Sequence, residues 1–207
     1  GVPALAKVPG LATVVGSVPG WVLRGWSRAA LRQRGGLRVE RSERVDTNRL
    51  DAFWQRFRAA PPPGCLVQER TAEYLAWRFD RNPGRDYLFH LACDGRGDVV
   101  AFAVSRAAAL QGAAARVVVD ACCLPNAGPE PIRALIADVR DLALRAGDPM
   151  LAMMVTQPNP LFPDPRRLGF LPTPHRFSFI TKPLETETPA ERDDLRWHLM
   201  WGDTDDL

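Results

Sequence analysis

Residues that could perform acid–base or nucleophilic chemistry lie close together near the middle of the chain: Asp120, Cys122 and Cys123. A carboxylate such as that of Asp120 can act as a general base, or it can form a buried ion pair with an arginine such as Arg78 or Arg106. We favour the ion pair. Cys122 could act as a nucleophile, but its spacing ties no histidine to it, so we interpret it as a small core residue.

Turn residues follow this run and could hold an anion. Pro125 ends a stretch rich in β-branched residues, because proline has no amide hydrogen to donate to a sheet. Asn126, Ala127 and Gly128 have turn chemistry, and Pro131 suits the first position of a helix. The amides at a helix N-terminus can bind a phosphate. The alternative, which the pattern alone favours, is a packed strand–helix–strand unit that binds no ligand.

The spacing of cysteine and histidine predicts no metal site and no disulfide framework. The four cysteines include no Cys-x-x-Cys pair. The residues considered as metal ligands lack ligand spacing: Cys65, His90, Cys93, His175 and His198. We therefore expect a reducing compartment and predict a cytoplasmic protein.

Charge and hydropathy argue against two classes of partner. The net charge of +3 is too small to argue for nucleic-acid binding. No apolar run reaches the ~18 residues that a membrane span needs. The apolar stretch from Val2 to Leu23 is interrupted by prolines and glycines and lacks a basic start, so we do not interpret it as a signal peptide. The chain begins with Gly1 rather than Met, and we expect more protein upstream in the parent gene.

A strand–helix–strand unit is expected to position the candidate residues. Arg116–Leu124 is predicted to be a strand, and the helix that starts near Pro131 is predicted to end at Gly147. The apolar stripe of this helix consists of Ile132, Leu135, Ile136, Val139 and Leu142. Pro149–Val155 is short and apolar, which is typical of a second strand. Two strands joined by a helix should run parallel with a right-handed crossover.

The chain before this unit is expected to begin with an extension and two helices. Residues 1–35 are predicted to be an N-terminal extension or interdomain linker, with a short helix between Trp21 and Leu31. After a first strand over Leu37–Arg41, Asp46 is placed to cap a helix. Its core stripe consists of Leu50, Phe53, Trp54 and Phe57. A second helix is predicted over Thr71–Phe79.

An antiparallel meander should lead into the central unit. Tyr87–Cys93 and Asp98–Leu110 have the composition of paired strands joined by a hairpin. Beyond the central unit, a short helix is predicted over Leu161–Leu168 and a strand over Phe177–Lys182.

The end of the chain is expected to form one more strand, over Leu195–Trp201. Alternation places four apolar residues on one face, as core or as an interdomain seam: Leu195, Trp197, Leu199 and Trp201. His198 then points the other way, which predicts a surface position or a partner contact. Residues 202–207 are predicted to be a loose tail.

The order of these elements resembles the fold of the GCN5-related N-acetyltransferases (GNATs) over Leu37–Trp201. Asn159, followed by Gly169 and Phe170, is similar to the family's Asn…Gly-Phe stretch, and Arg133–Leu135 stands where the family's phosphate-binding helix begins. The resemblance implies an α/β (α+β) fold. Its twisted sheet should be mixed and mostly antiparallel, with about six to seven strands flanked by helices around a central βαβ unit. The GNAT-like domain is predicted over 36–201.

A second detail concerns the partner. The run Tyr74-Leu75-x-Trp77-Arg78-Phe79, with Pro83 and Tyr87 after it, is similar to a bacterial subgroup of GNATs. In that subgroup two such domains are often fused in one chain. The resemblance therefore implies that an upstream GNAT domain in the parent chain is a possible partner.

The resemblance also implies transfer of an acyl group from acetyl-CoA or another acyl-CoA to an amine on a small molecule or peptide. In the family, acyl-CoA lies where two parallel strands diverge, and amides at the next helix N-terminus hold its pyrophosphate. The corresponding residues here are Cys122, Cys123, Leu124, Asn126, Ala127 and Gly128. Asn159 would hydrogen-bond the cofactor or cap the following helix, and Asp120 would be the base that takes the amine proton.

The chemical signatures of the family match less well than its order of elements. The family's loop, Gln/Arg-x-x-Gly-x-Gly/Ala, falls on Ala127, Glu130 and Ile132, so the pyrophosphate loop is degenerate. Glu130 would place a negative charge near a pyrophosphate, and Pro129 and Pro131 remove two amide donors. Pro165 replaces the tyrosine that often protonates the leaving thiolate. Two hypotheses follow: an N-acyltransferase, or a catalytically degenerate GNAT-fold domain that binds a partner such as an upstream domain.

Overall fold

A five-stranded sheet organises the computed structural model, which describes residues 20–31, 36–110, 112–173 and 195–204. In sheet order its strands are β1 (Arg38–Ser42), β3 (Tyr87–Cys93), β4 (Val99–Leu110), β5 (Ala113–Cys123) and β6 (Leu151–Met153). Only the β5–β6 pair among them is parallel. A separate parallel pair joins β2 (Cys65–Val67) to β7 (Arg196–His198). This mixed, mostly antiparallel arrangement confirms the predicted fold class.

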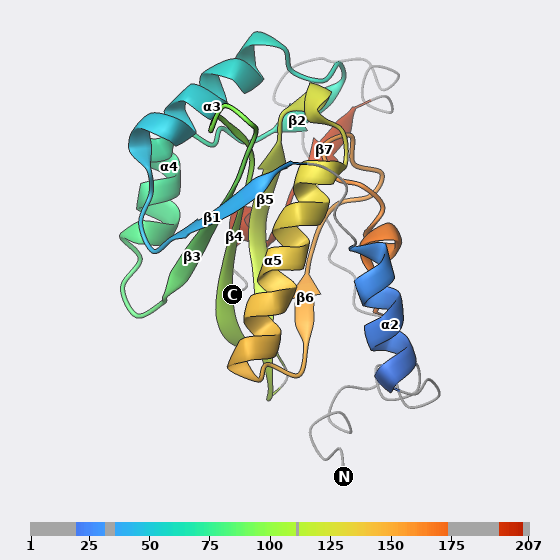
Figure 1. Ribbon diagram of the computed structural model, residues 1–207. Coiled ribbons are helices and arrows are strands. Elements are labelled where there is room, and N and C mark those ends of the chain that lie inside the picture. Colours follow the sequence, from blue (N-terminus) through green and yellow to red (C-terminus); the bar gives the residue numbers. More distant parts are fainter. Residues whose placement is uncertain (1–19, 32–35, 111, 174–194, 205–207) are drawn as a thin grey trace, which may run out of the picture.

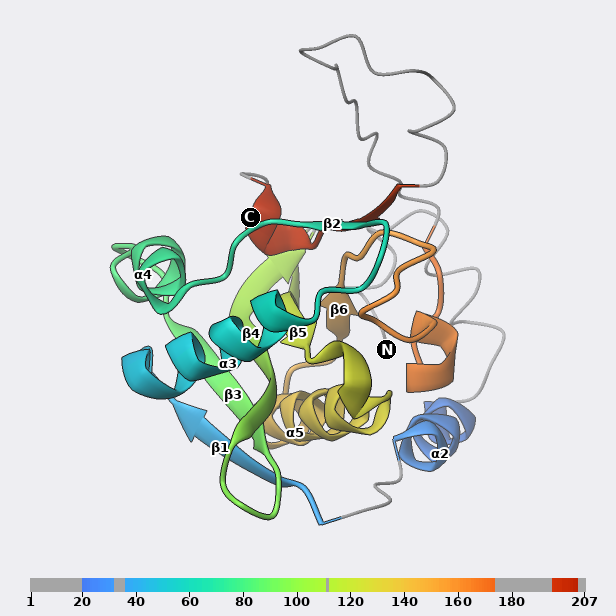
Figure 2. The same ribbon diagram turned by 90° about the horizontal axis from the view of Figure 1, so that it is seen from above.

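Helices cover both faces of the sheet (Figures 1 and 2). The α-helices are α2 (Gly20–Ala30), α3 (Thr47–Ala59), α4 (Ala72–Leu75) and α5 (Glu130–Ala146). The shorter helical turns are η2 (Ala76–Asp80), η3 (Pro125–Ala127), η4 (Pro165–Leu168) and η5 (Trp201–Asp203). Buried residues of α3, α4 and η2 form one core cluster with the sheet, and those of α5 form the other.

The central strand β5 contributes side chains to both cores. Cys122 packs towards α3 and α4, and Cys123 packs towards α5, as alternation along a strand predicts. A register shift in the β4–β5 pairing, between Val104 and Ser105, interrupts this alternation just before Asp120. Because of this bulge, the side chain of Asp120 points to the opposite face of the sheet from the one it would occupy in a strand without a bulge.

Helix α5 follows the predicted pattern closely. Four of the five predicted stripe residues are buried, and Leu142 is partly exposed. Gly147 ends the helix with φ 75°, a left-handed conformation that favours glycine. The parallel crossover from β5 through α5 to β6 is thus confirmed.

Asp46 caps α3 as predicted, and its contribution can be measured. Its Oδ1 accepts a hydrogen bond from the Arg49 amide at 3.3 Å. Replacing Asp46 with alanine should lower the free energy of unfolding by about 1 kcal/mol, because the helix loses a partner for an otherwise unpaired N–H. Urea denaturation measures this loss. Glu43→Ala changes an exposed acid just before the helix and is the control; an equal loss there would contradict a capping role.

Several short elements differ from the sequence predictions. Strand β6 covers only Leu151–Met153, and the predicted helix over Leu161–Leu168 is reduced to η4, because Pro163 and Pro165 disfavour a longer one. Strand β2 has no alternating pattern long enough to detect in the sequence. The predicted strand over 177–182 lies outside the described residues.

Candidate functional site

The parallel strands β5 and β6 separate partway along their length. They pair only from Arg116 opposite Leu151 to Val118 opposite Met153, whereas β5 continues to Cys123. The divergence of the two strands therefore starts near the middle of β5. Because β4 pairs with the other edge of β5, the strand is internal and one edge beyond Val118 is left for other groups.

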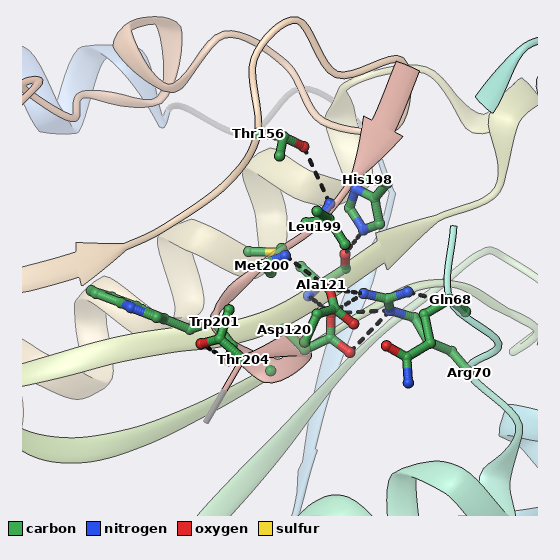
Figure 3. A network of polar contacts seen from close by, with 12 residues as sticks. Gln68, Arg70, Asp120, Ala121, Thr156, His198, Leu199, Met200, Trp201 and Thr204 are labelled. Atoms are coloured by element: carbon green, nitrogen blue, oxygen red, sulfur yellow. Dashed lines mark hydrogen bonds and ion pairs between the residues drawn. The ribbon is translucent and has the colours of Figure 1, made fainter. Parts of the chain in front are cut away.

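Residues Arg196–Thr204, which we call the C-terminal segment, lie beside this split. Met200 forms an antiparallel bridge with Val155, just beyond the end of β6. The Thr156 amide donates to the Leu199 carbonyl at 3.1 Å, and the Leu199 amide donates to Thr156 Oγ1 at 3.2 Å. Figure 3 shows that the segment passes from Thr156 to the neighbourhood of Asp120 on β5.

His198 reaches β5 from the C-terminal segment. Its Nε2 lies 2.8 Å from the carbonyl oxygen of Ala121, and its side chain is fully buried. Burial, reinforced by the charge of Arg70, lowers the pKa of His198 to about 3, so the ring is neutral. Since a carbonyl only accepts, Nε2 bears the hydrogen and Nδ1 accepts from Asn159 Nδ2 at 2.9 Å.

The predicted surface position of His198 is therefore wrong. In the described part of the last strand, His198 and Met200 are fully buried, whereas Trp197 and Leu199 are only partly buried. A buried, hydrogen-bonded histidine cannot be distinguished from a surface histidine by alternation alone. Trp201 does pack against the core, in agreement with the prediction for that residue.

Asn159 acts locally in the structure. Its Oδ1 accepts a hydrogen bond from the Leu161 amide at 2.9 Å, and its amide nitrogen faces His198. This hydrogen bond closes a local turn and does not cap a helix, because the following helix η4 is capped by Asp164. The same side chain also fixes the orientation of the imidazole that contacts β5.

A buried guanidinium joins β5 to the C-terminal segment. Arg70 has no exposed surface, and its Nε lies 3.1 Å and 3.0 Å from the two carboxylate oxygens of Asp120. Its terminal nitrogen donates to Asp120 Oδ1 at 3.0 Å and to Asp203 Oδ2 at 2.8 Å. Burial, opposed by the Arg70 charge and reinforced by Asp203, raises the pKa of Asp120. Asp120 thus forms the predicted ion pair, but with Arg70 rather than Arg78 or Arg106.

Arg78 binds the backbone of the same segment. Its Nε donates to the Gly202 carbonyl at 2.9 Å, and a terminal nitrogen donates to the Thr204 carbonyl. Arg78 was one of the two arginines considered as ion-pair partners of Asp120, but here it binds backbone carbonyls. Gly202 lies so close to β5 that a Cβ atom would be 3.1 Å from the Val119 carbonyl oxygen and 2.9 Å from Phe79. Residues 202–204 are therefore packed against the sheet rather than loose.

The remaining candidate residues lie at the carboxyl end of β5. Asn126 and Gly128 are exposed in the turn, and Leu124 and Ala127 are partly buried. The Cys123 thiol donates to the Leu124 carbonyl at 3.4 Å, and it lies 3.7 Å from the Gly128 carbonyl. Burial raises the pKa of the Cys122 thiol and that of the Cys123 thiol, the latter to about 12. Neither thiol is therefore a ready nucleophile.

The start of α5 lacks the features that make a strong anion site. No side chain caps the helix, and Pro129 and Pro131 have no amide hydrogen. The Glu130 carboxylate lies 3.5 Å from the Arg133 guanidinium, which offsets part of its charge. The loop that the sequence analysis predicted to be degenerate therefore offers few hydrogen-bond donors to an anion at the start of α5.

A second polar network, which the sequence did not reveal, contains serine, histidine and aspartate. His90 Nε2 lies 2.8 Å from Ser105 Oγ, and His90 Nδ1 lies 2.7 Å from Asp138 Oδ2. Arg41 binds the same carboxylate through two nitrogens, at 2.7 Å and 2.6 Å. Because Ser105 and His90 have no exposed surface, this network ties the sheet to α5 and does not act as a hydrolytic triad. The sequence contains one signal of this network: the acid Asp138 follows the buried stripe residue Leu135 by three positions on α5.

Metal centres, membrane spans and surface hollows are further kinds of site that the described residues could form. Among residues 20–31, 36–110, 112–173 and 195–204, no group of three metal-binding side chains is close enough to hold an ion. In the same residues, no helix is both long and apolar enough to cross a membrane. Two surface hollows lie away from β5; one adjoins β1, and the other lies over α4 and η2.

Comparison with known proteins defines the class of fold. No family model and no curated protein match the chain. Among solved structures, the ribosomal-protein-alanine N-acetyltransferase from Brucella melitensis biovar Abortus 2308 aligns with a TM-score of 0.50 and 14% identity. The alignment covers 71% of this chain and 99% of that chain. The chain thus has a GNAT-like fold.

Two further matches have lower TM-scores. The aminoglycoside acetyltransferase meta-AAC0020, from an uncultured soil metagenomic sample, aligns with a TM-score of 0.48 and 13% identity over 70% of this chain and 97% of that one. A GCN5-related glucosamine N-acetyltransferase region in a fungal multi-domain GH3 β-N-acetylglucosaminidase aligns with a TM-score of 0.43 and 12% identity. That alignment covers 61% of this chain but only 14% of the fungal protein.

Proposed function

We propose that this chain is an acyl-CoA-dependent N-acyltransferase that acts on an amine of a small molecule or peptide. The observation that supports this most directly is the separation of β5 from β6 after Val118, on a strand that leads through a turn into α5. Such a split leaves backbone hydrogen-bonding groups on one edge of β5 available to a ligand. Because acyl-CoA is a cytoplasmic metabolite, we also propose a cytoplasmic location.

The outer part of this edge fits an extended ligand arm. The Leu124 amide donates to the Val100 carbonyl on β4 at 2.9 Å, so the amide and carbonyl of the preceding residue, Cys123, face the split. The exposed turn lies directly beyond it. The proposed donor-binding residues are Cys122, Cys123, Leu124, Asn126, Ala127, Gly128 and Asn159. Acyl-CoA supplies the activated thioester, and the chain supplies the edge that orients it.

Asp120 has a different proposed role from that of a free base. Its carboxylate accepts hydrogen bonds from Arg70 and from the Ala121 amide, the latter at 2.9 Å. A carboxylate held in this way stays paired with Arg70 and keeps the guanidinium in position. We therefore propose that Asp120 is a positioning residue and that water accepts the proton of the amine.

A second candidate function is a catalytically degenerate domain over residues 36–201 that binds a partner, such as an upstream GNAT domain in the same parent chain. The specific observation that favours it is the start of α5, where Pro129 and Pro131 remove donors and Glu130 adds a negative charge. Each missing hydrogen bond to a charged phosphate would cost about 1.5–3 kcal/mol of affinity.

Calorimetric titration with acetyl-CoA separates the two candidates. Binding with a dissociation constant in the micromolar range would support the transferase, because that strength requires most of the proposed edge to be used. The control is a cooperative melting transition, which shows that the protein used is folded. If such a protein releases or absorbs no heat of binding at millimolar acetyl-CoA, donor binding by the wild-type chain is excluded.

Glu130→Gly gives a sharper test of the orientation of the donor. Removing this charge should tighten acetyl-CoA binding by about 3–10-fold, since one charge near a solvated phosphate is worth on the order of 1 kcal/mol. Calorimetry measures the change. Glu130→Gln removes the charge without loosening the backbone and should give most of the gain. An affinity that stays flat in both variants would mean that Glu130 does not face the phosphates.

A further inference from the structure

We propose that the C-terminal segment is an intramolecular plug of the donor site. It occupies the inner part of the split between β5 and β6, and it must move before an acyl donor can extend inward past Cys123. This inference rests on the proposed function, because it assumes that the split is the donor site. Three independent contacts support it.

The first contact satisfies the inner edge of β5. The peptide groups of Ala121 face the split, as those of Cys123 do, because alternate residues of a strand face the same edge. The Ala121 carbonyl accepts from His198 Nε2 at 2.8 Å, and the Ala121 amide donates to Asp120 at 2.9 Å. The chain itself therefore occupies the inner hydrogen-bonding positions that a ligand would need.

The second contact fills space where the two strands separate. Gly202 lies against the Val119 carbonyl, one residue beyond the last β5–β6 pair at Val118. A Cβ on Gly202 would be 3.1 Å from that carbonyl oxygen and 2.9 Å from Phe79. No room for a ligand remains between the segment and β5 at this depth.

The third contact holds the segment by charge. Arg70 is shared between Asp120 of β5 and Asp203 of the segment, and Arg78 donates to the Gly202 carbonyl at 2.9 Å. By contrast, regular strand pairing of the segment with other described residues is limited to three residues of β7 with β2 and one bridge at Met200. An element held by few ladder bonds and a shared ion pair can be released while the β4–β5 core stays intact.

Two substitutions should release the segment by different means. Asp203→Ala removes its ion pair but leaves Arg70 paired with Asp120, and Gly202→Ala introduces a steric conflict without changing charge. In each variant we expect acetyl-CoA to bind at least tenfold more tightly than to wild type. Amide hydrogen exchange of residues 200–204 should also accelerate at least tenfold. Asp148→Ala breaks the distant Arg116–Asp148 pair on β5 and should change neither quantity.

The two measurements distinguish failure of the plug from failure of the proposed function. Unchanged exchange in both variants, or equal acetyl-CoA affinity in wild type and in variants with accelerated exchange, would overturn the plug and leave the transferase proposal standing. Accelerated exchange without any acetyl-CoA binding would overturn the proposed function, and the gating role with it. A similar gain in Asp148→Ala would show that general loosening is responsible, and it would also overturn the plug.

Discussion

Replacing Arg70 with methionine is expected to lower the free energy of unfolding by about 3–5 kcal/mol, the usual cost of leaving a buried charge without its partner. Arg70 is the only cation hydrogen-bonded to both Asp120 and Asp203 in the described structure, and the side chains of these residues are 0–3% exposed. Methionine fills similar volume but leaves both carboxylates facing each other in the interior. Urea denaturation at pH 7, followed by circular dichroism, measures the loss.

The pH dependence of this variant provides a second readout. Burial and Asp203 already raise the pKa of Asp120, and Arg70 is the group that opposes the rise. Without Arg70 the pKa should rise further. An acid whose pKa is raised on folding destabilises the fold as pH increases through that range, so the deficit should shrink as pH falls towards 4.

An exposed pair provides the matched control for Arg70. Arg58 lies 3.8 Å from Glu69, and their side chains are 58% and 67% exposed. Arg58→Met should cost no more than about 1 kcal/mol. If Arg70→Met cost as little as Arg58→Met, the Arg70–Asp120–Asp203 cluster would not contribute to stability in the way that its burial indicates.

Asp138→Asn is expected to cost about 2 kcal/mol at pH 7 and to remove a specific acid sensitivity. Although burial opposes it, hydrogen bonds from His90 and Arg41 lower the pKa of Asp138 from 3.8 to about 2. A shift of that size corresponds to about 2 kcal/mol. The stability is present above pH ~4 and is lost as pH falls from about 4 to 2, because the unfolded chain binds the proton first.

Stability measured between pH 2 and pH 7 tests this prediction. Wild type should lose more stability than Asp138→Asn over the range from 4 to 2, and the two curves should converge at low pH. Asp141→Asn is the control on the same helix, because the side chain of this acid is 48% exposed and forms its ion pair with the adjacent Arg140. Parallel curves for wild type and Asp138→Asn would show that the network around His90 does not lower this pKa.

The wider consequence of both predictions concerns how this fold uses its interior polar groups. The Arg70 cluster joins β5 to the C-terminal segment, and the His90 network joins β1, β3 and β4 to α5. Neither presents a reactive group to solvent in the structure described. Under the proposed function, chemistry at the split would therefore depend on the backbone edge of β5 and on whether the segment covering it can move.

Local patterns in the sequence determined most of the elements. The stripe and the cap of α3, the stripe of α5 with Gly147 after it, and the meander of β3, β4 and β5 all lie where the spacing places them. A helix longer than about two turns, or a strand longer than about five residues, repeats its apolar side chains often enough to show a period. Such a period can be read within a short stretch of the sequence, without knowledge of distant contacts. The same signals were sufficient to indicate the class of fold.

Only the tertiary structure decided the contents of the candidate site. Arg70 lies 50 residues from Asp120 and 133 from Asp203, and His198 lies 77 residues from Ala121. A polar side chain can be buried only where a distant partner satisfies it, and no period in the sequence records that partner. For this reason the sequence placed His198 at the surface and residues 202–204 in a tail, whereas long-range hydrogen bonds and ion pairs bring both onto β5.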